Sequence, residues 1–107
     1  MFYILEDDTP VPVDIKDPRL EKIWSDIKHR RIALDQVTSK VRVSTVFLCL
    51  DHNFEGSGDP VLFETMIFGG KLDDYQVRAR TKQEALDNHR VAVEMVKSRK
   101  IQVGGNE

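Results

Sequence analysis

The run VRVSTVFLCL at residues 41–50 constrains the fold more than any other stretch of this chain. It is dense in β-branched and aromatic residues and contains neither glycine nor proline, a composition typical of a β-strand. Alternation places Val41, Val43, Thr45, Phe47 and Cys49 on one face and Arg42, Ser44, Val46, Leu48 and Leu50 on the other. Because both faces become apolar toward the end, we expect a central strand that is covered on both sides.

Further strands are predicted on either side of this run. Residues 61–68 (VLFETMIF) form a second strand, which makes a long-looped hairpin with the first, and residues 74–80 (DYQVRAR) form a third. Residues 2–5 and 11–15 predict a short N-terminal hairpin, in which two prolines restrict the second strand to an edge.

Two helices complete the predicted fold. Asp17-Pro18 is a helix start, and the helix is expected to run to about residue 31. Thr81 and Glu84 form a capping box that opens a second helix. The order ββ-α-β-β-β-α predicts the α+β class, an antiparallel sheet meander packed by two helices. We expect a single domain over residues 1–97 and a flexible tail over residues 98–107.

Length and charge limit the classes of function. A chain of 107 residues makes one domain with a modest core, so we expect a homo-oligomer. The formal net charge of −2 argues against a duplex nucleic-acid binder, which carries a basic footprint. The single cysteine, Cys49, fits a reducing compartment. The sequence contains no apolar run of membrane-spanning length and no signal-peptide pattern, so we expect a cytoplasmic protein that does not enter a membrane.

Asp51, His52, Asn53 and Phe54 follow the strand directly and form a polar cluster. In catalysis a histidine can act as a general base that a neighbouring aspartate orients. Adjacent residues on a strand point to opposite faces, however, so Asp51 and His52 cannot easily orient one another. No nucleophile motif is present, so an enzyme is not predicted. Two interpretations remain open. The cluster is either a strand end in which Asp51 or Asn53 accepts backbone hydrogen bonds, or a ligand-binding loop.

Other titratable residues have structural alternatives. His29, His52 and His89 share no metal-ligand spacing, so neither a metal nor a cofactor is predicted. His89 lies on the apolar stripe of the last predicted helix and is either a satisfied core residue or a ligand-binding donor. Glu64 lies among apolar residues and requires a partner, for which an arginine of a neighbouring strand is the simplest choice.

The arginines favour a binding function. Arg30 and Arg31 end the first predicted helix, and Arg78 lies on the third predicted strand of the sheet. The guanidinium fork of arginine binds phosphate, and aromatic rings can stack on a base. The same residues are also compatible with a solvated surface over a packed core. The chain has no Walker loop and no Rossmann fingerprint.

The strings VSTVFLCLDHNF and LFETMIFGG, followed by the capping-box helix, resemble a family of short bacteriophage and prophage proteins. The resemblance covers about residues 24–93. Cys49 and Asn88 depart from it, because the family pattern has glycine at both positions. The resemblance implies a phage context more strongly than it implies an activity.

Small phage proteins without catalytic motifs often counter host immunity, as the Thoeris anti-defence proteins do. The resemblance therefore suggests a sponge that sequesters a nucleotide-derived signal, such as a cyclic ADP-ribose isomer or a cyclic oligonucleotide, in the cytoplasm of the infected host. The predicted ligand-binding residues are Asp51, His52, Asn53, Phe54, Arg30, Arg31, Glu64, Arg78 and His89. Two alternatives remain: a protein-interaction module that inhibits a host enzyme or joins a phage assembly, and a metal-dependent hydrolase.

Overall fold

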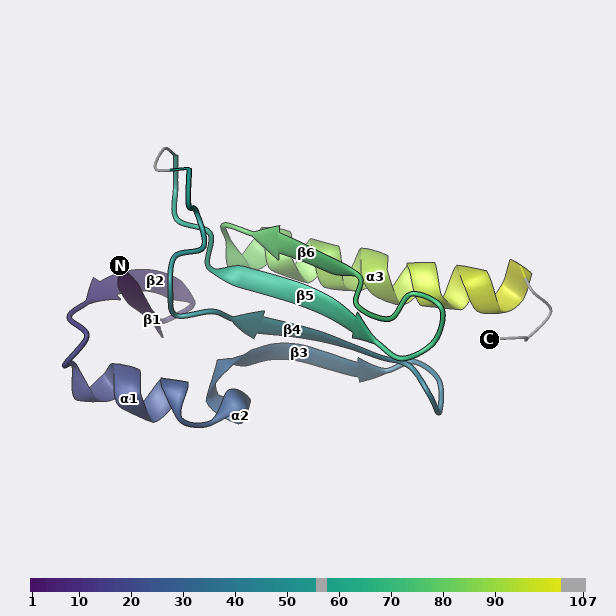
Figure 1. The fold of residues 1–107 in the computed structure, drawn as a ribbon, viewed down its shortest axis with the longest axis horizontal. Helices are drawn as coiled ribbons and strands as arrows, with labels where there is room; N and C mark the ends of the chain where they lie inside the picture. The colour runs from purple at the N-terminus through teal and green to yellow at the C-terminus, as the bar shows by residue number, and fades with distance from the viewer. Residues whose placement is uncertain (56–57, 103–107) are drawn as a thin grey trace.

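The computed structural model describes residues 1–55 and 58–102, and within them the chain forms two antiparallel sheets and three helices (Figure 1). In chain order the elements are β1 (Phe2–Glu6), β2 (Thr9–Val13), α1 (Pro18–Trp24), α2 (Ile27–Arg30), β3 (Arg31–Gln36), β4 (Arg42–Phe47), β5 (Phe63–Phe68), β6 (Gln76–Ala79) and α3 (Lys82–Gln102). The predicted α+β class is confirmed.

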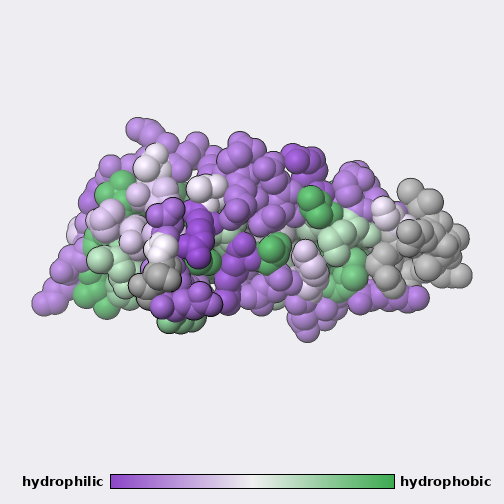
Figure 2. Space-filling view, turned by 90° about the horizontal axis from the view of Figure 1, so that it is seen from above, coloured by the Kyte–Doolittle hydropathy of each residue, from purple (hydrophilic) through white to green (hydrophobic). Residues whose placement is uncertain are grey.

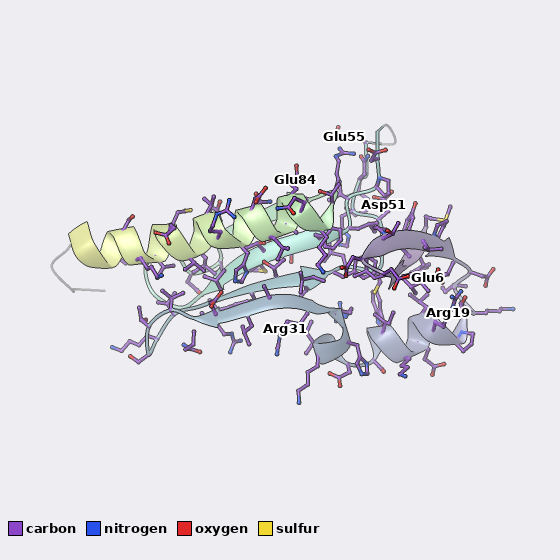
Figure 3. All side chains as sticks on the ribbon, turned by 180° about the vertical axis from the view of Figure 1, so that it is seen from behind. Glu6, Arg19, Arg31, Asp51, Glu55 and Glu84 are labelled. Carbon is purple, nitrogen blue, oxygen red and sulfur yellow. The ribbon has the colours of Figure 1, made fainter. Side chains whose placement is uncertain are left out.

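The main sheet has the strand order β3-β4-β5-β6, each strand antiparallel to its neighbour. The predicted hairpin of the two central strands is confirmed, with Arg42 opposite Phe68 and Phe47 opposite Phe63. α3 lies behind this sheet in Figure 1 and in front of it in Figure 3. The residues buried between α3 and the sheet include Val43, Thr45, Phe47, Phe63, Thr65, Ile67, Ala85, His89, Ala92 and Val96.

The predicted first helix is wrong in its second half. α1 ends at Trp24, and Asp26 has an extended backbone and caps the separate helix α2 by accepting a hydrogen bond from the Lys28 amide (2.9 Å). Asp caps helices by this bond, so a capping residue inside an otherwise helical pattern starts a new helix. The chain then turns into β3, a strand that was not predicted.

β3 was not predicted because its pairing with β4 is irregular. It is an edge strand that pairs with β4, and the register shifts between Arg31 and Ala33. Such a bulge places two residues opposite one and breaks the alternation by which a strand is recognised in sequence. The correct element order is therefore ββ-α-α-β-β-β-β-α, with three helices in place of two.

α3 begins as predicted but ends later. The Thr81 hydroxyl accepts from the Glu84 amide (3.1 Å), and the Glu84 carboxylate accepts from the Arg80 amide (2.9 Å), which satisfies two amides at the start of the helix. The helix continues to Gln102, so residues 98–102 of the expected tail are helical. Residues 103–107 of that tail lie outside the described residues.

The second face of the main sheet differs from the prediction of a strand covered on both sides. Of the β4 residues on that face, Arg42 is exposed, and Ser44 and Val46 are partly buried. They line a cavity, bordered at one end by α2. This second face, called the open face below, has surface available for binding.

The N-terminal hairpin joins the main body next to the polar cluster. β1 pairs with β2, and Phe2 bridges to Leu50, while the Tyr3 amide donates to the Cys49 carbonyl (2.7 Å). In the part of the chain that the structure describes, no helix is long and apolar enough to cross a membrane. Figure 2 shows a mainly hydrophilic surface, with hydrophobic patches over the N-terminal elements and toward the far end of α3.

Cys49 occupies a backbone conformation that is uncommon for a residue with a side chain. Its φ is +66°, in the left-handed region where glycine is favoured. The side chain is fully buried, and burial raises the pKa of the thiol to about 11, although the charge of Arg30 opposes this shift. The thiol is therefore protonated at neutral pH and is a poor nucleophile.

Candidate functional site

The predicted binding residues fall in three separate places. Figure 3 shows Asp51 at the base of the loop that projects from the sheet and Glu55 farther along it, whereas Arg31 lies at the start of β3, next to α2. His89 is in α3, on the covered face of the sheet. The nine residues therefore do not form one site.

Asp51 and Asn53 shape the projecting loop. One Asp51 carboxylate oxygen accepts from the amides of Asn53 (2.7 Å) and Val61 (2.8 Å), which ties the two ends of the loop together. The Asn53 side chain donates to the Asp59 carbonyl (3.0 Å), and Arg80 reaches the same carbonyl. This geometry favours the structural interpretation of the cluster, in which its polar groups satisfy loop backbone.

His52 and Phe54 belong to the same loop. The His52 Nδ1 lies 2.7 Å from the Leu50 carbonyl, and the His52 ring lies 5.6 Å from that of Phe54. Phe54 is 78% exposed. The loop therefore presents an aromatic ring to solvent, at a distance from the predicted arginines of the open face.

Acid is expected to weaken the loop through Asp51. Burial alone raises the pKa of this carboxyl, but hydrogen bonds from the Asn53 and Val61 amides outweigh burial and hold the pKa below its ordinary 3.8. A depressed folded-state pKa gives stability that is present above pH 3.8 and is lost as the pH falls through the folded-state value. We expect Asp51→Asn to melt at a lower temperature at neutral pH and to lose less stability on acidification.

Melting curves recorded by circular dichroism from pH 7 to pH 2 measure this dependence. Asp59→Asn, which changes an exposed carboxylate of the same loop, is the matched control and should keep the full acid dependence of the parent protein. Equal acid dependence in Asp51→Asn and the parent protein would contradict the assignment.

His89 is a satisfied core residue, one of the two alternatives for it. Its Nε2 lies 2.7 Å from the Asp35 carboxylate, and its Nδ1 lies 2.8 Å from the Thr45 hydroxyl, which in turn lies 2.6 Å from the Thr65 hydroxyl. Both threonines are buried. The chain of bonds joins α3 to three strands of the sheet. It has the connectivity of a catalytic triad, but its hydroxyls are inaccessible.

Glu64 forms the cross-strand ion pair that its sequence context predicts. It lies opposite Arg78 in the register of β5 and β6, with Nε of the arginine 3.0 Å from its carboxylate. Gln76 donates to the same oxygen (2.8 Å). The guanidinium of Arg78 is therefore engaged, and it is a weaker candidate for phosphate binding than the other arginines.

The open face holds a cavity of about 420 Å³. Its lining residues come from α2 and three strands: Ile27, Arg30, Arg31, Leu34, Arg42, Ser44, Val46, Leu48, Glu64, Met66 and Phe68. Three arginines thus surround a mainly apolar floor, and the one carboxylate of the lining is already paired. The arrangement attracts an anion and offers apolar surface to the rest of the same ligand.

Two of these arginines contact aromatic rings. The Arg30 guanidinium lies 5.4 Å from the centre of the Trp24 ring, and the Arg42 guanidinium lies 5.0 Å from that of Phe68. The Arg30 Nε is buried and has no hydrogen-bond partner among the described residues. Because a buried charged donor is costly when unpaired, an acceptor at this place would stabilise the protein.

Arg42 and Phe68 were not predicted as site residues. The alternation of β4 already placed Arg42 on the same face as Ser44 and Val46, and that was the available signal. What the sequence lacked was the identity of the neighbouring strands. The open face is completed by β3, which was not predicted, and by α2, whose helix was predicted as part of α1.

A larger hollow of about 580 Å³ lies along α3 and is lined by Leu72, Arg90, Val91, Glu94, Met95 and Ser98. It has one arginine and one glutamate, so it lacks the excess of positive charge found on the open face. We therefore place the candidate site on the open face despite its smaller volume.

Within residues 1–55 and 58–102, no three His, Cys, Asp or Glu side chains are grouped so that they could hold a metal ion. Comparisons of the chain with protein-family models, with curated proteins and with solved structures found no match.

Proposed function

We propose that the protein is a non-catalytic binding protein that sequesters a nucleotide-derived anion on the open face of its main sheet. In the phage context implied by the sequence resemblance, the ligand would be a host immune signal, and the protein would act as a homo-oligomer in the bacterial cytoplasm. Arg30, Arg31 and Arg42 would hold phosphate, and Phe68 would face the base.

One observation carries this proposal: three arginines gather at an apolar cavity in a chain whose formal net charge is −2. Acidic residues outnumber basic ones along the chain, yet the cavity has an excess of cations. A guanidinium group can donate two parallel hydrogen bonds to the oxygens of one phosphate. The buried Nε of Arg30 is a donor without a hydrogen-bond partner among the described residues. A ligand with a phosphate and a flat apolar part satisfies both features of the cavity.

Two features favour binding over catalysis. The hydroxyls of Thr45 and Thr65 are buried and bonded within the Asp35–His89 chain, where a substrate cannot reach them. The Cys49 thiol is buried, and its raised pKa keeps it protonated. A ligand held on the open face therefore meets no activated nucleophile from these groups.

Arg31→Ala and Arg42→Ala test the assignment of the site. We expect each to weaken binding of a nucleotide ligand by roughly tenfold or more, because a charge-assisted hydrogen bond contributes about 1.5–3 kcal/mol. Calorimetric titration with adenine and guanine nucleotides and with cyclic ADP-ribose measures the affinity. Arg90→Ala removes an exposed arginine of α3 and should leave binding unchanged.

Recovery of the ligand tests sequestration. After incubation and heat denaturation of the protein, a binding protein releases its ligand chemically intact, as chromatography of the supernatant would show. Turnover of the ligand would contradict the non-catalytic part of the proposal, and failure of every nucleotide to bind would contradict all of it.

A protein partner is the second candidate function. Three large apolar residues at or next to the cavity are exposed to solvent: Trp24 by 48%, Ile27 by 43% and Leu34 by 45%. Aromatic residues next to arginine are typical of protein interfaces. This function predicts that Trp24→Ala abolishes co-purification of a host protein while nucleotides leave the melting temperature unchanged.

A further inference from the structure

We infer that the ligand of the open face contains at least two nucleotide units, as a short single-stranded or cyclic oligonucleotide does. This inference rests on the proposed function and narrows its ligand class. It is carried by a second hollow on the same face, by the cations that line each hollow, and by the aromatic ring that lines both.

The second hollow, of about 400 Å³, adjoins the cavity described above. Its lining residues are Gln36, Ser39, Lys40, Arg42, Phe68 and Gly69. Arg42 and Phe68 also line the first cavity, so the two hollows adjoin along the open face, and the pair is called the groove below. The second hollow is more polar than the first and adds the cation of Lys40.

The cationic groups lie at separate positions along the groove. Arg31 lines only the first cavity, Lys40 lines only the second hollow, and Arg42 lines both. A mononucleotide in the first cavity can bring its phosphate to Arg31 and Arg42 but has no second phosphate for Lys40, whereas a ligand with phosphates on two successive units has one.

Phe68 lies where a base would stack. It is partly exposed, and Arg42 approaches its ring from the same strand pair. A flat sheet surface with an aromatic ring between cations is the arrangement by which proteins bind single-stranded nucleic acid, since stacking accepts any base and the cations follow the backbone. Glu64, the carboxylate of the groove, is neutralised by Arg78.

The net charge of −2 that argues against a duplex binder does not oppose this ligand. A short oligonucleotide has few phosphates and needs only local cations, which the groove supplies as Arg30, Arg31, Lys40 and Arg42. Each phosphate contact made to a single strand should also give a salt dependence, with a slope of log affinity against log salt of about −0.7.

Fluorescence anisotropy with four labelled probes tests the inference: a 5′-mononucleotide, a linear dinucleotide, a linear tetranucleotide and a cyclic dinucleotide. We expect the best two-unit probe to bind at least tenfold tighter than the mononucleotide. Lys40→Ala, which changes only the second hollow, should weaken that probe by roughly tenfold and leave the mononucleotide unchanged. Lys22→Ala, an exposed lysine of α1, is the matched control.

The outcomes separate this inference from the proposed function. Equal affinity for the mononucleotide and for all longer probes would overturn the two-unit ligand and leave the proposed nucleotide site standing. The same holds if Lys40→Ala weakens binding of the mononucleotide and of the two-unit probe by the same factor. Absence of binding to every probe overturns both. Preference for the linear or for the cyclic probe supports the inference in either case and identifies the source of the ligand.

Discussion

Gly69→Ala adds a single methyl group and is expected to destabilise the fold by about 3 kcal/mol. Gly69 follows β5 with a φ of +93°, where an L side chain is strained. A Cβ at this position would also penetrate the carbonyl of Lys40, a backbone atom that cannot turn away. For a domain of this size the loss corresponds to a fall in melting temperature of roughly 15 °C.

Gly70→Ala is the control, because the next residue also has a positive φ, of +68°, but is exposed. It should cost only about 1 kcal/mol, the strain of a left-handed backbone. Urea unfolding of both variants measures the difference, which isolates the clash with Lys40. Equal destabilisation of the two variants would show that the close approach of Gly69 to the turn before β4 does not matter.

Thr45→Val is expected to cost about 3 kcal/mol although it keeps the shape of the side chain, since it leaves two buried groups unpaired at about 1–3 kcal/mol each. The Thr45 hydroxyl is the bond partner of both His89 and Thr65 in a region without solvent access. Valine offers a methyl group to both. Thermal and urea unfolding of the variant measure the loss.

The double variant Thr45→Val with Thr65→Val separates the loss of hydrogen bonds from other causes of destabilisation. Removing the second hydroxyl also removes one of the two unpaired groups, so the double variant should be no less stable than Thr45→Val alone. Ser44→Val, one residue away on the open face, should change stability by less than about 0.5 kcal/mol. Additive losses in the double variant would contradict the account.

Much of the fold was predictable because its strongest patterns are regular. The strand in residues 41–50, its hairpin with residues 61–68 and the capping box at Thr81 are each set by local chemistry, and the structure has all three. β3 was missed because a bulge interrupts its alternation. α2 was missed because the helical spacing of apolar residues continues across the break at Ser25, where only the capping chemistry of Asp26 gives a signal.

The candidate site was predictable only in part. Arg30 and Arg31 lie on the open face and line its cavity. Asp51 and Asn53 carry polar groups suited to ligand binding, but their hydrogen bonds close a loop. His89 depended on Asp35, a residue 54 positions away whose role as partner has no local signature. Long-range pairing decides which polar residues remain available, and a sequence pattern does not contain that information.

The alternation of β4 between a covered and an open face has an evolutionary consequence. Val43, Thr45 and Phe47 are fixed by packing against α3, whereas Arg42, Ser44 and Val46 border only the groove. Selection on the proposed ligand site can therefore act on even-numbered positions of this strand without disturbing folding, which the odd-numbered positions maintain. Related chains that meet different ligands should diverge at every second residue here, and a library randomised at the even positions alone should consist largely of folded proteins.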